Sequence, residues 1–75
     1  MQKIYTKISQ IAGDVITVEA EGVTYKELAE VRTRTGVSLA QVIRMDGNKV
    51  SLQVLAGSRG ISTDDTVRFL SLIHI

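Results

Sequence analysis

The side chains that could carry out chemistry in this sequence are few and scattered. The chain has one histidine, His74, beside the C-terminus, and no cysteine. One copy of the chain therefore offers neither a histidine-based triad nor a multi-histidine or thiolate metal site, and we interpret His74 as part of a terminal strand. The carboxylates Asp64 and Asp65 are adjacent, but neighbouring side chains in a strand point apart, and residues 62–66 have the composition of a turn. The sequence predicts no catalytic residue and no metal site.

Five arginines could form a basic patch for nucleic acid: Arg32, Arg34, Arg44, Arg59 and Arg68. Acidic residues nearly cancel them, because eight Asp and Glu oppose nine Lys and Arg and leave a net charge of +1. Proteins that read nucleic acid on a small barrel combine a basic groove with stacking aromatic side chains. Aromatic residues make up only 4% of this chain, so we predict a solvated surface of mixed charge and no nucleic-acid partner.

A glycine-rich segment at residues 57–60 has the GxxG form, with Ser58 and Arg59 between its glycines. This form clamps the nucleic-acid backbone in one class of RNA-binding module, where helices flank it. Here it comes after a predicted strand at residues 49–55, which favours a tight glycine turn. The phosphate-cradling pattern G-x-x-x-x-G-K-[ST] is absent from the sequence, so we expect no cofactor on this chain.

The elements that must position these residues are predicted to be strands. The chain has nine Val, eight Ile, seven Thr and no Pro, and branching at Cβ suits a pleated sheet. The tripeptide Asp46-Gly47-Asn48 between two alternating runs is the most specific local signal, because it predicts a tight hairpin. Alternation predicts strands at residues 3–8, 15–20, 38–45, 49–55 and 67–75.

The segment at residues 24–31 permits two interpretations. Thr24 and Glu27 have the spacing of a helix capping box, whereas a period of two relates Ala29, Val31 and Thr33. We favour a loop that leads into a strand, since the β-prone pattern continues past Thr33.

About six short strands separated by turns are typical of a sandwich or a barrel. We predict an all-β fold, a small closed β-barrel of about six strands, because an open sheet this short would leave long edges. Residues 1–75 are enough for one domain, whose core should include Val50, Leu52 and Val54. No run reaches the ~18 apolar residues of a membrane-spanning helix, and the start lacks the features of a signal peptide. We therefore expect an intracellular protein without direct membrane insertion.

The order of the pieces resembles the N-terminal β-barrel domain of the B-type subunits of V-type (A/V-type) ATP synthases. The resemblance covers about residues 4–70, and a Gly-Val-Thr-Tyr-Lys-Glu-Leu block together with Val67-Arg68-Phe69 favours the B-type over its sister, the A-type subunit. Residues 71–75 match nothing in the family, so we expect an N-terminal fragment of a longer chain. The other matching pieces are Tyr5-Thr-Lys-Ile8 with Ile11 and Gly13, Val18-Glu19, Glu27-Leu28-Ala29-Glu30-Val31, Gln41-Val42-Ile43, Gly47-Asn48-Lys49-Val50, Leu52-Gln53-Val54 and Gly57-Ser58-Arg59-Gly60-Ile61.

The resemblance implies a non-catalytic crown domain that helps hold a hexameric ring together. The ring's other subunits, foremost those of the A-type, would be its partners, and ATP or ADP would bind only to later parts of the full-length parent. Such a complex couples ATP synthesis or hydrolysis to proton or sodium transport and lies in the cytoplasm, peripheral to the membrane. The fragment alone is expected to be a monomer or weak dimer. The residues themselves leave two alternatives open: a nucleic-acid-binding barrel of the OB or SH3-like kind, and an autonomous scaffold barrel.

Overall fold

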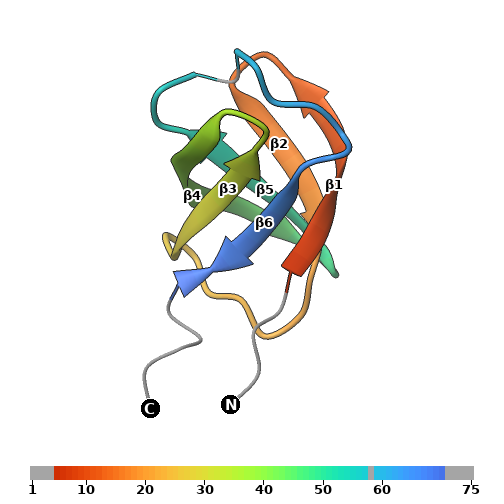
Figure 1. Ribbon diagram of the computed structural model, residues 1–75. Helices are drawn as coiled ribbons and strands as arrows, with labels where there is room; N and C mark the ends of the chain where they lie inside the picture. Colours follow the sequence, from red (N-terminus) through yellow and green to blue (C-terminus); the bar gives the residue numbers. More distant parts are fainter. Residues whose placement is uncertain (1–4, 58, 71–75) are drawn as a thin grey trace.

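The computed structural model describes residues 5–57 and 59–70, whose regular elements are six strands joined into a closed barrel (Figure 1). Neighbouring strands are antiparallel and have the order β1-β2-β5-β4-β3-β6 around the barrel. The predicted all-β barrel is confirmed. The strands are β1 (Tyr5–Ala12), β2 (Val15–Glu19), β3 (Leu28–Thr33), β4 (Gly36–Asp46), β5 (Lys49–Val54) and β6 (Thr66–Phe69).

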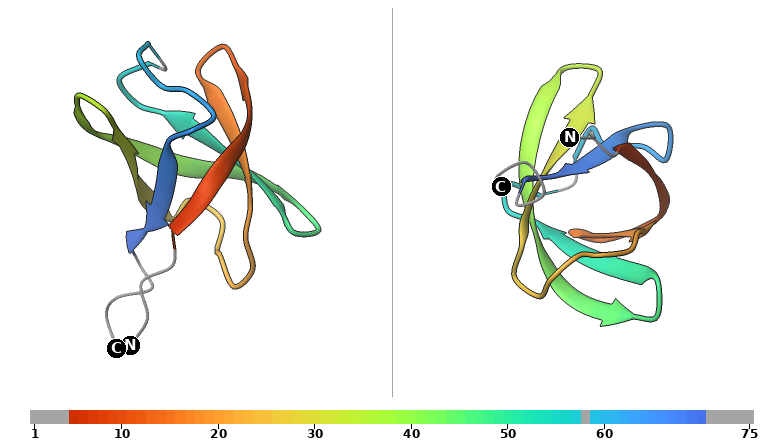
Figure 2. Two further views of the ribbon diagram at one scale, coloured as in Figure 1. Left: turned by 45° about the vertical axis from the view of Figure 1, so that its right-hand side comes forward. Right: turned by 90° about the horizontal axis from the view of Figure 1, so that it is seen from below.

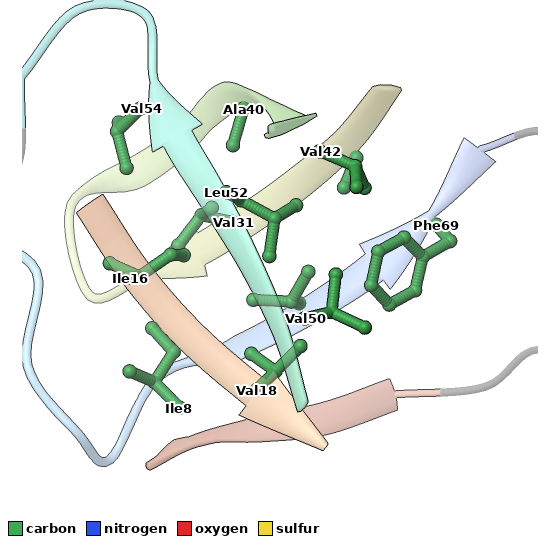
Figure 3. Packing of buried hydrophobic residues seen from close by; sticks show 12 residues of the cluster. Ile8, Ile16, Val18, Val31, Ala40, Val42, Val50, Leu52, Val54 and Phe69 are labelled. Atoms are coloured by element: carbon green, nitrogen blue, oxygen red, sulfur yellow. The ribbon is translucent and has the colours of Figure 1, made fainter. Parts of the chain in front are cut away.

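Alternating residues of all six strands fill the barrel with apolar side chains (Figure 3). Seen from below, the strands curve around this core (Figure 2, right). The predicted inward face of β5 is confirmed, since Val50, Leu52 and Val54 are all buried. The full set of buried hydrophobic residues is Ile8, Ile16, Val18, Ala29, Val31, Ala40, Val42, Val50, Leu52, Val54, Val67 and Phe69.

The first strand is longer than alternation predicted. β1 continues to Ala12, whereas the prediction ended at residue 8. The cause is a bulge at Ser9: Ile8 pairs with Val18 and Gln10 pairs with Thr17, which is adjacent to Val18, so Ser9 has no residue opposite it on β2. The extra residue exchanges the inward and outward positions that follow it. A prediction based on strict alternation therefore ends the strand at this point.

A second bulge changes the facing of β4. Strict alternation along residues 38–45 predicts that Arg44 lies on the same face as Ala40 and Val42. In the structure the register shifts between Val42 and Arg44, so Ile43 is the extra residue. Arg44 is opposite the outward-facing Ser51 and is exposed. The prediction for Arg44 was wrong because a bulge inverts the faces of every later residue.

The β4–β5 hairpin forms where the sequence predicted it. Asp46 pairs with Lys49, so Gly47 and Asn48 are the two loop residues. Gly47 has a φ of 66°. Asn48 does not have a positive φ, because Lys26 is the one non-glycine residue with positive φ among the described residues. Positive φ at the first loop residue alone is the pattern of a type II′ turn, which places glycine first.

The ambiguous segment at residues 24–31 is a turn that leads into β3, as we favoured, and not a helix. One of the two capping-box hydrogen bonds is nevertheless present, since Thr24 N donates to Glu27 Oε1 at 2.8 Å. The other is replaced by a backbone turn bond, in which Glu27 N donates to Thr24 O at 3.1 Å. Val42 N then donates to Glu27 O at 2.9 Å, which joins the chain to the sheet. The segment does not continue as a helix, because the backbone groups of Lys26 and Glu27 form hydrogen bonds with Val42 of β4.

The last strand closes the barrel. β6 pairs with β1 on one side and with β3 on the other. The strand predicted at residues 67–75 is confirmed as far as Phe69; residues 71–75, including His74, lie outside the described residues. None of the described residues form a membrane-spanning helix.

The core position of Leu52 gives the first prediction. Leu52 is fully buried, whereas the nearby Leu55 is 56% exposed. We expect Leu52→Ala to lower the free energy of unfolding by about 2–5 kcal/mol through lost burial and a cavity, a large part of the roughly 4–11 kcal/mol typical of a domain this size. Urea denaturation measures the change. Leu55→Ala is the matched control and should stay within about 0.5 kcal/mol; equal losses in both variants would contradict the inward placement of Leu52.

Candidate functional site

Two carboxylates, Glu27 and Asp65, are the buried charged side chains of the described residues. Asp65 Oδ2 accepts a hydrogen bond from Ser62 N at 2.9 Å, and Asp65 N donates to Ser62 O at 3.0 Å. Glu27 makes the same reciprocal pair with Thr24, and its Oε1 also accepts from Thr24 Oγ1 at 3.1 Å. Each carboxylate immediately precedes a strand, β3 or β6. Both carboxylates therefore stabilise turns that immediately precede neighbouring strands. In each turn a backbone N–H donates a hydrogen bond to one carboxylate oxygen.

The adjacent carboxylates of the sequence diverge in the structure. Asp65 is buried, whereas Asp64 is exposed and its backbone N–H bonds to Ser62 Oγ at 3.3 Å. This is the turn chemistry that the polar cluster indicated. Within residues 5–57 and 59–70 no group of three or more His, Cys, Asp and Glu side chains comes together as a metal site. The residue type of Asp65 did not predict its burial. The only sequence signal for its hydrogen bond with Ser62 N is the spacing of three residues between Ser62 and Asp65.

The five arginines lie on different elements of the barrel. Arg32 and Arg34 lie toward the β3–β4 turn, whereas Arg44 lies near the far end of β4. Arg59 is in the loop after β5. Arg68 on β6 pairs with Glu30 on β3, with 3.0 Å between Arg68 Nη2 and Glu30 Oε1. No one strand or one end of the barrel gathers all five, and Arg68 is already neutralised.

The glycine-rich segment at residues 57–60 is a loop between β5 and β6. Gly57 and Gly60 have φ angles of 88° and 86°, a backbone conformation that suits glycine. Ser58 lies outside the described residues. The described part has strands, not α-helices, on either side of this loop. The positive φ angles of Gly57 and Gly60 agree with the glycine turn that we favoured, and the described elements on either side of the loop are not the helices that an RNA-clamping GxxG loop needs.

Two surface cavities occur in the described part of the chain. The first, of 280 Å³, lies between the β2–β3 loop and the β4–β5 hairpin. The second, of 520 Å³, is lined by Thr6, Lys7, Ile8, Ser9, Glu19, Thr63 and Asp64. Neither lining combines a nucleophile with a neighbouring base and a group of convergent donors, the arrangement that covalent or acid–base catalysis requires.

The fold and these contacts define a small closed antiparallel β-barrel domain, in which Glu27 and Asp65 fix turns and Arg68 pairs with Glu30 across two strands. Residues 8–71 match the ATP synthase alpha/beta family, beta-barrel domain. This match covers most of the chain, and the chain belongs to that family.

The curated relatives are beta chains of V-type ATP synthases, which correspond to the B-type subunits of the resemblance. Over 70 residues the chain is 63% identical to the V-type ATP synthase beta chain of Treponema denticola and 54% identical to that of Borreliella burgdorferi. It is 60% identical to V-type ATP synthase beta chain 1 of Treponema pallidum. Each match covers 93% of this chain and 16% of the relative. The resemblance to the N-terminal barrel of the B-type subunit is confirmed, and the chain spans about one sixth of these relatives' length.

The buried carboxylate of Asp65 gives the second prediction. We expect Asp65→Ala to destabilise the barrel by about 1–2 kcal/mol, because Ser62 N loses its acceptor at the start of β6. Thermal unfolding monitored by circular dichroism measures the change. Asp64→Ala removes the same charge from the exposed neighbour and should leave the midpoint within about 2 °C. Equal effects at both positions would mean that net charge, not the hydrogen bond, stabilises this turn.

Proposed function

We propose that this chain is the non-catalytic crown domain of the B-type subunit in a V-type rotary ATP synthase. Identities of 54–63% to beta chains of such synthases support the proposal. The observation that carries it is the barrel itself: its core is apolar, and its two buried carboxylates serve turns. A domain built this way supplies shape and contact surface.

In this proposal the barrel holds its own B-type subunit next to A-type subunits in a hexameric ring. ATP and ADP bind to parts of the protein that come after the barrel, and no residue of this chain touches nucleotide. The complex couples ATP synthesis or hydrolysis to proton or sodium transport and lies peripheral to the membrane on its cytoplasmic side. The barrel contributes stiffness, because a closed antiparallel sheet resists the shear that an open sheet permits.

A lateral face of one barrel is small. The described chain has principal extents of 32 × 24 × 18 Å, so contact over part of one side buries an area near the lower limit of the ~1,000 Å², counted over both partners, that a stable interface normally needs. The barrel alone is therefore a monomer or weak dimer, and the ring's affinity comes mainly from the larger domains.

A domain exchange tests the proposed function, and this is the third prediction. We expect a Treponema denticola beta chain whose matching 70 residues are replaced by this barrel to assemble with the other subunits of that synthase. Native mass spectrometry or light scattering measures the assembly. A matched chain lacking any barrel is the control and should assemble less completely. A chimera that is folded but excluded from the complex would contradict the proposal.

Nucleotide binding gives the fourth prediction. Titration calorimetry of this chain with Mg-ATP should show no saturable binding at micromolar concentration, because residues 5–57 and 59–70 contain no phosphate-cradling loop or metal cluster. The same protein titrated with a single-stranded oligonucleotide should also show no binding at physiological salt. Tight oligonucleotide binding that weakens steeply with salt would instead support a nucleic-acid-binding barrel.

A further inference from the structure

The exposed large hydrophobic side chains of the described residues gather on one side of the barrel. They lie on β3 and β4, in the loop before β3 and immediately after β5, whereas the described side chains of β1, β2 and β6 include none. Single exposed apolar residues are common on any protein, but a group of them on one side marks an interaction surface. The seven residues are Tyr25, Leu28, Val37, Leu39, Ile43, Met45 and Leu55.

Four of these side chains form one continuous patch on the outer surface of the sheet. Alternate residues of β3 and β4 face the core, which leaves Leu28, Val37 and Leu39 on the outer side. Leu55 lies beside Leu39, because Leu55 N donates to Leu39 O at 2.9 Å. Leu28 is opposite Gln41 and is therefore the diagonal neighbour of Leu39. We call Leu28, Val37, Leu39 and Leu55 the apolar face; they are 42–56% exposed.

Positive charge is in excess at both ends of the apolar face. At one end Arg32 lies on the outer side of β3, and Arg34 lies in the turn between β3 and β4. Toward the other end, near the β4–β5 hairpin, one carboxylate, Asp46, lies close to two cations, Arg44 and Lys49. The apolar face is therefore aliphatic at its centre and basic at its ends.

These charges argue against a second copy of this chain as the partner. Two copies that met through the apolar face would bring basic ends together or place them on aliphatic side chains, and like charges across an interface cost free energy. Glu30, the carboxylate on the outer side of β3, is already paired with Arg68 at 3.0 Å. Nucleic acid also fits poorly, because the aliphatic centre gives bases no aromatic side chain to stack on.

The apolar face lies on the side of the barrel and not at one of its open ends. Its residues are on the outer surfaces of β3 and β4 and next to the end of β5. Figure 1 shows β3 and β4 away from β1, which is three strands from β4 in either direction around the barrel. In the proposed ring each barrel meets its neighbours through its sides, so the apolar face is placed for such a contact.

We propose that the barrel contacts the adjacent A-type subunit of the ring through the apolar face, and that this neighbour presents aliphatic side chains with Asp or Glu residues opposite Arg32 and Arg34. The inference rests on the proposed function. Four apolar side chains are few beside the roughly 20–30 residues that each partner of a standard interface contributes. The contact therefore forms because the larger domains hold the two subunits next to each other at high effective concentration.

Charge reversal in the assembled ring tests this contact. The Treponema denticola chimera carries either Arg32→Glu or, as the matched control, Lys7→Glu. Both residues are exposed and lie opposite Thr66, Arg32 on β3 and Lys7 on β1. We expect the Arg32→Glu ring to dissociate at a concentration at least about tenfold higher than the unsubstituted ring, because a carboxylate then faces carboxylates. Lys7→Glu should change this concentration by less than about twofold. Light scattering during dilution measures it.

Each other result decides the matter. Both isolated variants should keep their unfolding midpoints within about 2 °C, since both side chains are exposed. A ring that forms but responds equally to the two substitutions, or to neither, would overturn the contact and leave the proposed function standing. Exclusion of the folded, unsubstituted chimera from the ring would overturn both proposals.

Photo-crosslinking identifies the partner independently. Benzoylphenylalanine in place of Leu39, which is 45% exposed, leaves the core unchanged and lies at the centre of the apolar face. In the ring we expect cross-links to the adjacent A-type subunit, in a peptide that contains Asp or Glu. Cross-links to a second beta chain, or to a later part of the same beta chain, would overturn the proposed partner. A ring without any cross-link from this position would overturn the contact itself.

Discussion

Closure of the barrel depends on β6, a strand of four residues with a partner on each side. Without it, β1 and β3 would be open edges, and the core would lose the buried side chains of Val67 and Phe69. The bond from Ser62 N to Asp65 determines where this strand begins. The ion pair between Glu30 and Arg68 then joins β3 to β6 on the outside. The Ser62–Asp65 hydrogen bond and the Glu30–Arg68 ion pair thus help β6 to close the barrel around its apolar core.

The sequence predicts this fold well wherever one residue on a strand faces one residue on its partner. The inward face of β5 and the Gly47-Asn48 hairpin can be derived directly from alternation and turn chemistry. Alternation fails at Ser9 and Ile43, because each residue is an unpaired insertion in its strand. A bulge depends on how two strands curve around each other. Neither strand's own sequence contains that information, and the facing of Arg44 was therefore mistaken.

The candidate site was harder to predict because the same four-residue spacing, Thr24 to Glu27, can precede either a helix or a strand. Thr24 N bonds to the Glu27 carboxylate as in a capping box, but Glu27 N bonds to the Thr24 backbone carbonyl, and the chain continues as a strand. Those bonds stabilise a single turn. The residues that follow form a strand because the neighbouring strand β4 forms backbone hydrogen bonds with them. Ser62 and Asp65 repeat the arrangement before β6. The apolar face is likewise visible only in three dimensions, because it depends on which strands are neighbours around the barrel.

The first and last strands determine how the domain responds to tension. β1 begins and β6 ends at the same end of the barrel, where Tyr5 pairs with Arg68 (Figure 1). A force that pulls these two ends apart acts across the strands, so it breaks the β1–β6 hydrogen bonds one after another. Unzipping of this kind needs much less force than shearing, in which all the bonds of a strand pair break together. The barrel is therefore poorly suited to transmit tension between the start of β1 and the end of β6.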